Sequence, residues 1–191
     1  GQTLRIGSLG NVAITGNVTT GQGGDAFNPM YLDAGNLLTI NAGNGVVSAA
    51  DGAFLRLRAG NGNTASPFQF ARIDAGATGG VTVQAPAGIV QTQSGATGGG
   101  IRAASVTLNA DSAGSAIDGP PSEALVVRGA TSLTLTSAGS VDIDRTDGVN
   151  PIPALNRLDI SRSDSAAAFA LTGFSAGQSA RRLDFPVIPA L

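Results

Sequence analysis

The segment VDIDRTDG, at positions 141–148, carries the residues of this sequence that are best placed for chemistry. Asp142 and Asp144 alternate with apolar residues, so on a β-strand with its apolar side chains inward both carboxylates project from the outer face, about 7 Å apart. Arg145 and Asp147 follow directly. Paired carboxylates can perform acid–base chemistry on a glycan or bind Ca²⁺ through oxygen ligands. The four charged residues are therefore a candidate surface for contact with a glycan or another ligand.

The same four residues also fit a solvated strand face that ends in an Asp-Gly turn. Catalysis by two carboxylates requires neighbours that raise the pKa of one of them, and Thr and Asp residues on an outer face supply no apolar pocket. The sequence contains no His and no Cys, which removes the usual general base and the imidazole and thiolate ligands of metals. We therefore predict a protein that is not an enzyme, with no catalytic residues, no metal site and no cofactor.

Composition restricts the partners and the architecture. Glycine accounts for 28 of the 191 residues, while charged residues make up 13% and aromatic residues 4%, which favours tight turns and closely stacked layers. A formal net charge of −2 argues against nucleic acid as the main partner. No run of about 18 apolar residues occurs, so no helix is expected to insert into a membrane. The chain opens at Gly1 without Met, which is expected of a segment of a longer chain.

A triplet of one hydrophobic, one variable and one hydrophobic residue recurs along the whole chain. Successive triplets start 26, 17, 26, 25, 27, 25 and 25 residues apart. Two further short apolar segments accompany most triplets, and all three alternate with the period of two that indicates β-strands. The triplets begin at Val12, Leu38, Leu55, Val81, Val106, Leu133, Leu158 and Leu183.

One repeat of three short strands cannot bury its inward side chains, so repeats have to stack, with each strand pairing in parallel with its equivalent. The sequence thus predicts one all-β domain over residues 1–191, a parallel β-solenoid of about seven turns with roughly 25 residues each. The 17-residue step predicts an irregular turn or a loop at 63–70. One outer row is expected to hold Thr39, Thr82, Thr107 and Thr134. The predicted core consists of Ile14, Leu38, Ile40, Leu55, Leu57, Val81, Val83, Val106, Leu108, Leu133, Leu135, Leu158 and Ile160.

The segments NLLTINAGNGVVSA, at 36–49, and SLTLTSAGSVDI, at 132–143, resemble the repeats of filamentous haemagglutinin-like exoproteins and related giant bacterial β-strand-repeat adhesins. The resemblance is carried by the Leu-Thr-Ile and Leu-Thr-Leu triplets followed by Ala-Gly, and the repeat covers most of the chain. It implies a right-handed parallel β-helix that is secreted across a bacterial outer membrane and forms long surface fibres for adhesion. The repeats of this chain are longer, and its loops more variable, than those of that family.

The expected function is therefore a structural segment of an extracellular fibre or stalk on the bacterial cell surface. Its expected partners are other copies of the chain, stacked end to end into a filament, or flanking parts of the parent chain. Host or bacterial surface glycans or proteins are further expected partners, whereas nucleic acid and direct membrane insertion are not expected. The alternative function is that of a parallel β-helix protein that binds or cleaves glycans with its outward carboxylates.

Overall fold

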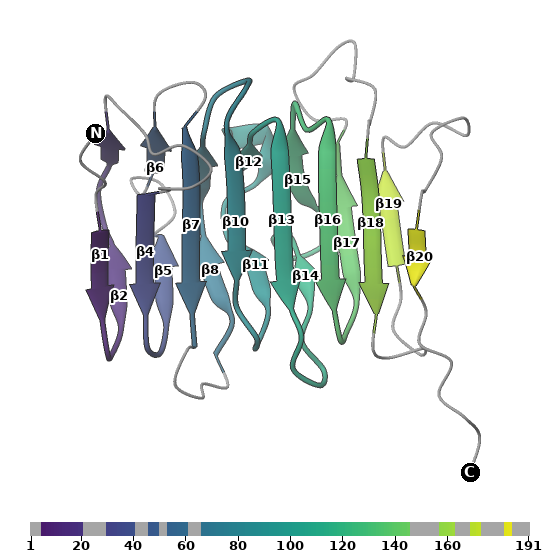
Figure 1. Cartoon of the computed structure of the whole chain (residues 1–191), viewed down its shortest axis with the longest axis horizontal. Helices are drawn as coiled ribbons and strands as arrows, with labels where there is room; N and C mark the ends of the chain where they lie inside the picture. The colour runs from purple at the N-terminus through teal and green to yellow at the C-terminus, as the bar shows by residue number, and fades with distance from the viewer. Residues whose placement is uncertain are drawn as a thin grey trace.

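The structure, a computed structural model, describes residues 5–20, 30–40, 46–49, 53–60, 66–145, 157–162, 169–172 and 182–184. These residues form β-strands and their turns, with one short 3-10 turn, η1 (Gly95–Thr97). Equivalent strands of successive turns pair in parallel; β10, for example, pairs with β7 of the preceding turn and with β13 of the next. The chain therefore forms an all-β parallel solenoid, as the repeat predicts (Figure 1). Among the residues described, no helix reaches the length and hydropathy of a membrane span.

The strands lie on three faces of the coil. Face A is an eight-stranded sheet of β1 (Arg5–Ser8), β4 (Met30–Ala34), β7 (Phe54–Ala59), β10 (Gly80–Gln84), β13 (Ser105–Ala110), β16 (Ser132–Ser137), β18 (Arg157–Arg162) and β20 (Arg182–Asp184). Face B contains β2 (Val12–Ile14), β5 (Leu38–Ile40), β8 (Phe68–Phe70), β11 (Ile89–Gln91), β14 (Ile117–Asp118), β17 (Val141–Asp144) and β19 (Phe169–Thr172). Face C contains β3 (Val18–Thr20), β6 (Val46–Ala49), β9 (Arg72–Asp74), β12 (Gly100–Arg102) and β15 (Leu125–Arg128).

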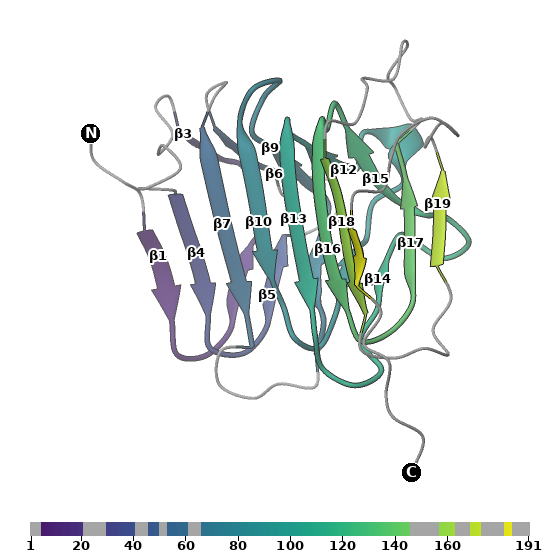
Figure 2. The ribbon, with the colours of Figure 1, turned by 45° about the vertical axis from the view of Figure 1, so that its right-hand side comes forward.

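Faces B and C belong to one twelve-stranded sheet, because β15 pairs with β17 as well as with β12. Figure 2 shows the strands of face A side by side, with β17 and β19 of face B on another side of the coil. Face A is therefore a broad surface of its own, on which outward side chains from successive turns lie next to one another.

The alternation in the sequence places every second side chain inside the coil. In β13 and β16 buried and partly exposed residues alternate along the whole strand. Leu57, Val83 and Leu108 are stacked in register on face A and are at most 1% exposed. Complete burial of one such side chain contributes roughly 1.5–3 kcal/mol to stability, so the stacked column helps to hold successive turns together.

The structure buries the predicted core positions whose side chains it describes: Ile14, Leu38, Ile40, Leu55, Leu57, Val81, Val83, Val106, Leu108, Leu133 and Leu135. Leu158 and Ile160 pair in register with Leu133 and Leu135, but their side chains lie outside the described part of the chain.

The register differs from the predicted one in the first turns. The triplets at Val12 and Leu38 lie on face B, where β5 is followed by β8. On face A, Leu32 pairs with Leu57. The 17-residue step is therefore a change of face and not an irregular turn, and 63–70 includes the regular strand β8. Along face A the aligned inward residues are 26, 25, 26, 25, 27, 25 and 23 positions apart.

Two further details of the prediction change with this register. Leu183 pairs with Ile160 and not with Leu158. Thr82, Thr107 and Thr134 do share one outer row, whereas Thr39 lies on face B beside Gln69. The physical reason is that triplets on faces A and B alternate identically, so periodicity does not tell one face from the other.

The corners between faces bring the backbones of adjacent turns close together. At one corner the side chain of Gln91 is fully buried. Its nitrogen donates to the carbonyl oxygen of Gln93 over 2.6 Å, and its oxygen accepts from the backbone nitrogen of Val126 over 2.8 Å. At the corner between β16 and β17, Gly139 packs against the carbonyl group of Ser115 with no room for a side chain. Such contacts explain why the composition is rich in glycine.

Candidate functional site

The predicted carboxylates lie on face B, where β17 alternates between the core and solvent. Val141 and Ile143 are buried, while Asp142 and Asp144 are partly exposed on the outer side. Because Ile117 pairs with Val141, Asp118 of β14 lies next to Asp142 on the neighbouring turn. Sequence reasoning missed Asp118, although its distance of about one repeat from Asp142 was a usable signal.

Arg145 lies in the core and not beside the two carboxylates on the outer surface. It is 1% exposed, and its Nη2 atom donates to the carbonyl oxygen of Ala130 over 2.6 Å. Its position in the chain continues the inward alternation of Val141 and Ile143. Burial lowers the pKa of the Arg145 guanidinium. This placement removes Arg145 from the surface on which glycan contact was predicted. Asp147, the fourth predicted residue, lies outside the described residues.

The described carboxylates of this surface, Asp118, Asp142 and Asp144, form an acidic row. Among the residues described, no group of three or more Asp, Glu, His or Cys side chains has the arrangement to hold a metal ion. Burial raises the pKa of the Asp142 carboxyl, and the charges of Asp118 and Asp144 raise it further. The row is thus a place where negative charges repel one another.

This repulsion predicts a measurable pH dependence of stability. Because the pKa of Asp142 is higher in the folded than in the unfolded chain, the folded state binds its proton more tightly, and the free energy of unfolding falls as pH rises through that pKa. We expect Asp142→Asn to be more stable than the parent at neutral pH and to lose part of this dependence. Urea denaturation between about pH 3 and pH 7 measures both effects. Asp111→Asn, at an exposed position, is the control, and its free energy of unfolding should vary with pH as that of the parent does. If the free energy of unfolding of Asp142→Asn also varied with pH as that of the parent does, the expectation would be contradicted.

A second group of polar residues lies on the outer side of face A, over β1, β4 and β7. In one row Arg5, Tyr31 and Arg56 are in register, and the guanidinium carbons of the two arginines lie 4.6 Å and 6.0 Å from the centroid of the Tyr31 ring. In the next row Arg58 binds Asp33 through two hydrogen bonds, from Nη2 over 2.5 Å and from Nε over 3.3 Å. The bonds to Asp33 raise the pKa of Arg58. These side chains line a hollow of about 380 Å³.

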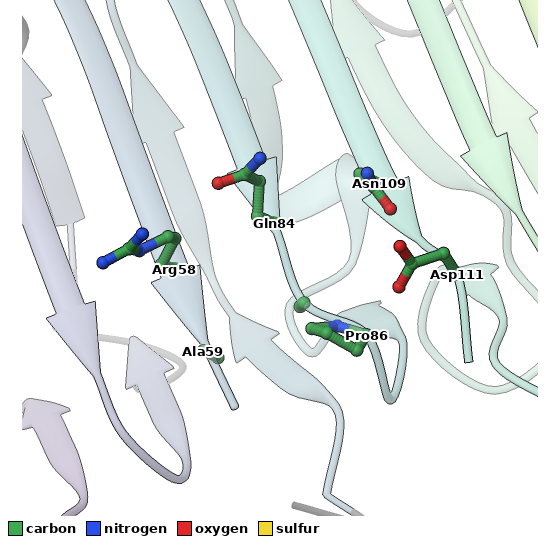
Figure 3. Close-up of a pocket in the computed structure, with 7 residues that line it drawn as sticks. Arg58, Ala59, Gln84, Pro86, Asn109 and Asp111 are labelled. Atoms are coloured by element: carbon green, nitrogen blue, oxygen red, sulfur yellow. The ribbon is translucent and has the colours of Figure 1, made fainter. Parts of the chain in front are cut away.

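A second hollow, of about 180 Å³, adjoins the first at Arg58. Figure 3 shows Gln84, Asn109 and Asp111 on its other side, contributed by β10, by β13 and by the turn after β13. Arg56 is tied to the same region, because its Nη2 atom donates to the side-chain oxygen of Gln84 over 3.3 Å. We call the two hollows together the face A groove; it crosses β1, β4, β7, β10 and β13.

Sequence reasoning missed the face A groove because of the misassigned triplets. The predicted register placed Arg56 beside Thr39, whereas the structure places it beside Tyr31. The spacing of 25 residues from Tyr31 to Arg56 and from Asp33 to Arg58 matches the repeat and was the signal that could have identified the cluster.

No protein-family model, curated protein or solved structure matches this chain. A function therefore has to be inferred from the fold and from the chemistry of the two outer surfaces. In the acidic row the carboxylates repel one another, while the face A groove combines cations, an aromatic ring and amide groups in a concave surface.

Proposed function

We propose that this chain is a stiff structural segment of an extracellular bacterial fibre or stalk, in which it keeps the parts on either side of it at a fixed separation. The observation that carries the proposal is the uninterrupted parallel pairing of face A through eight strands. At about 4.8 Å per strand these eight strands span roughly 34 Å. The Leu-Thr-Leu and Ala-Gly segments that resemble filamentous haemagglutinin-like repeats support the extracellular and bacterial setting.

Stiffness follows from the way successive turns are joined. Bending such a rod separates turns on at least one face, which breaks several backbone hydrogen bonds worth about 0.5–1.5 kcal/mol each and exposes stacked Leu, Ile and Val side chains. Each turn contacts only its neighbours, so the same arrangement can be lengthened without changing its cross-section.

The first turn supports growth of the rod by stacking. Ile6, Val12 and Val18 are only partly buried there, although they point toward the core as their counterparts one turn later do. Leu32, Leu38 and Val47, which pair with them, are at most 1% exposed. Among the described strands β1 pairs only with β4, so its outer edge offers backbone hydrogen-bonding groups to a further solenoid turn, from another copy or from flanking chain.

Electron microscopy of the purified protein at low and high concentration tests the proposal. We expect straight rods of uniform width, which lengthen into filaments with an axial repeat of about 4.8 Å as the concentration rises. Ile6→Asp, which places a charge on the apolar end, should shorten the filaments, whereas Thr107→Asp on the outer side of face A should not. Flexible or globular particles at every concentration would overturn the proposal.

A further inference from the structure

Positive charge gathers in the face A groove of a chain that is acidic as a whole. Three arginines and one aspartate line its first hollow, while the formal net charge of the chain is −2. The eleven cationic residues of the chain are all arginine, the side chain that binds carboxylate, sulfate and phosphate groups with two parallel hydrogen bonds. The concentration of these cations in a concave surface indicates a binding site for an anionic ligand.

Contacts with the Tyr31 ring orient the guanidinium groups of Arg5 and Arg56 before a ligand binds. Tyr31 lies between Arg5 and Arg56 in the parallel register, and both guanidinium groups approach its ring. A guanidinium that stacks on a ring keeps its N–H groups directed in its own plane, where they can donate to an anion. Two strand spacings separate the arginines in the sheet, so the backbone positions of the two cations are about 10 Å apart along the rod.

The third cation shows which anion fits. Arg58 already holds the carboxylate of Asp33 through two of its nitrogen atoms, inside the same hollow. This ion pair neutralises Arg58, so Arg5 and Arg56 carry the net positive charge of the hollow. Arg56 donates from Nη2 to the neutral amide of Gln84, which does not cancel its charge. Beyond Arg58, the amides of Gln84 and Asn109 and the carboxylate of Asp111 line the second hollow, and such groups hydrogen-bond hydroxyls.

From this arrangement we infer that the face A groove binds an acidic polysaccharide, with uronate carboxylates on Arg5 and Arg56 and sugar hydroxyls in the second hollow. The groove crosses five strands, so it suits an extended polymer better than a small ion. The inference is independent of the fibre role, because a rod that never forms filaments can still bind a glycan along its side.

Two other polymers fit the groove less well. Single-stranded nucleic acid is bound by bases that stack on exposed aromatic rings, and the ring of Tyr31 is approached by two arginines instead. An extended peptide adds to the edge of a sheet, whereas the groove runs across the strands of a sheet face. A carboxylated glycan requires neither a free ring nor a free edge.

Calorimetric titration with alginate oligosaccharides, in Ca²⁺-free buffer of low ionic strength, tests the inference. We expect binding that weakens as salt is added, and no binding of the neutral polymer dextran. The double variant Arg5→Gln/Arg56→Gln should bind alginate about tenfold more weakly or worse, because each arginine contributes charge-assisted hydrogen bonds. Arg102→Gln, an exposed arginine on face C, removes one charge elsewhere and should bind as the parent does.

Three results would overturn the inference. The first is unchanged alginate affinity in the double variant, provided that its circular dichroism matches that of the parent. The second is tighter binding of single-stranded DNA than of alginate. The third is a failure to bind alginate; a salt-sensitive dimer that the double variant abolishes would then assign the groove to the acidic row of a second copy. The alginate and DNA titrations use rods at concentrations below filament formation, so their outcome is distinguishable from a failure to form filaments.

Discussion

Leu108→Asp is expected to abolish cooperative folding, while Thr107→Asp at the neighbouring position leaves the fold intact. Leu108 is fully buried on β13, in register with Val83 and Leu135, and Thr107 projects outward between Thr82 and Thr134. Removal of a buried leucine alone typically lowers the free energy of unfolding by about 2–5 kcal/mol. The aspartate adds a charge without a partner in the core, and natural domains of this size are stable by only about 5–15 kcal/mol.

Far-UV circular dichroism and urea denaturation of the two variants measure this difference. The β-sheet signal and the unfolding transition should be lost in Leu108→Asp and retained in Thr107→Asp, whose carboxylate stays in solvent. Leu108→Ala provides an intermediate that should still fold, with a smaller free energy of unfolding than the parent. A Leu108→Asp variant that unfolds cooperatively at the parental urea concentration would mean that β13 does not face the core in this way.

Gly139→Ala is expected to lower the free energy of unfolding by about 2–3 kcal/mol through a clash between backbones. A Cβ at Gly139 would overlap the carbonyl oxygen of Ser115 on the preceding turn. The obstacle is backbone and not the end of a flexible side chain, so the two turns would have to move apart. That movement also strains the adjacent hydrogen bonds, from Ala138 to Ala110 and from Ile117 to Ser140, each 2.9 Å long.

Gly16→Ala is the matched control for this substitution. Gly16 is exposed, and an added Cβ there meets no atom within 4 Å. The free energy of unfolding should change by less than about 0.5 kcal/mol, as for most surface substitutions. Equal effects at Gly16 and Gly139, measured by urea denaturation, would show that the cost lies in lost chain flexibility and not in the close approach of the two turns.

The acidic row and the face A groove differ in how far the sequence could reveal them. Asp142 and Asp144 are two residues apart, so their common outward direction follows from the alternation of one strand. Arg145 was expected beside them because it follows Asp144 directly in the sequence, but the same alternation directs position 145 inward, and the structure buries it. The alternation was therefore a better guide to the side chain's direction than its proximity in the sequence.

The architecture itself could be predicted because it depends on local patterns. Strands that alternate with a period of two and recur about every 25 residues can bury their apolar side chains only by stacking, which fixes an all-β parallel solenoid and most of its inward positions. From Val81 to Leu135 the predicted triplets pair in register as expected, since each lies on face A and the intervals between them are nearly constant.

Tertiary structure alone decided which face each strand joins and which outward side chains meet across turns. Val12, Leu38 and Leu55 begin triplets of the same pattern, yet the first two belong to face B and the third to face A. The lengths and conformations of the corners make this assignment, and they leave no periodic signal in the sequence. The contact of Tyr31 with Arg5 and Arg56 depends on it, because side chains a repeat apart become neighbours only once the register between turns is set.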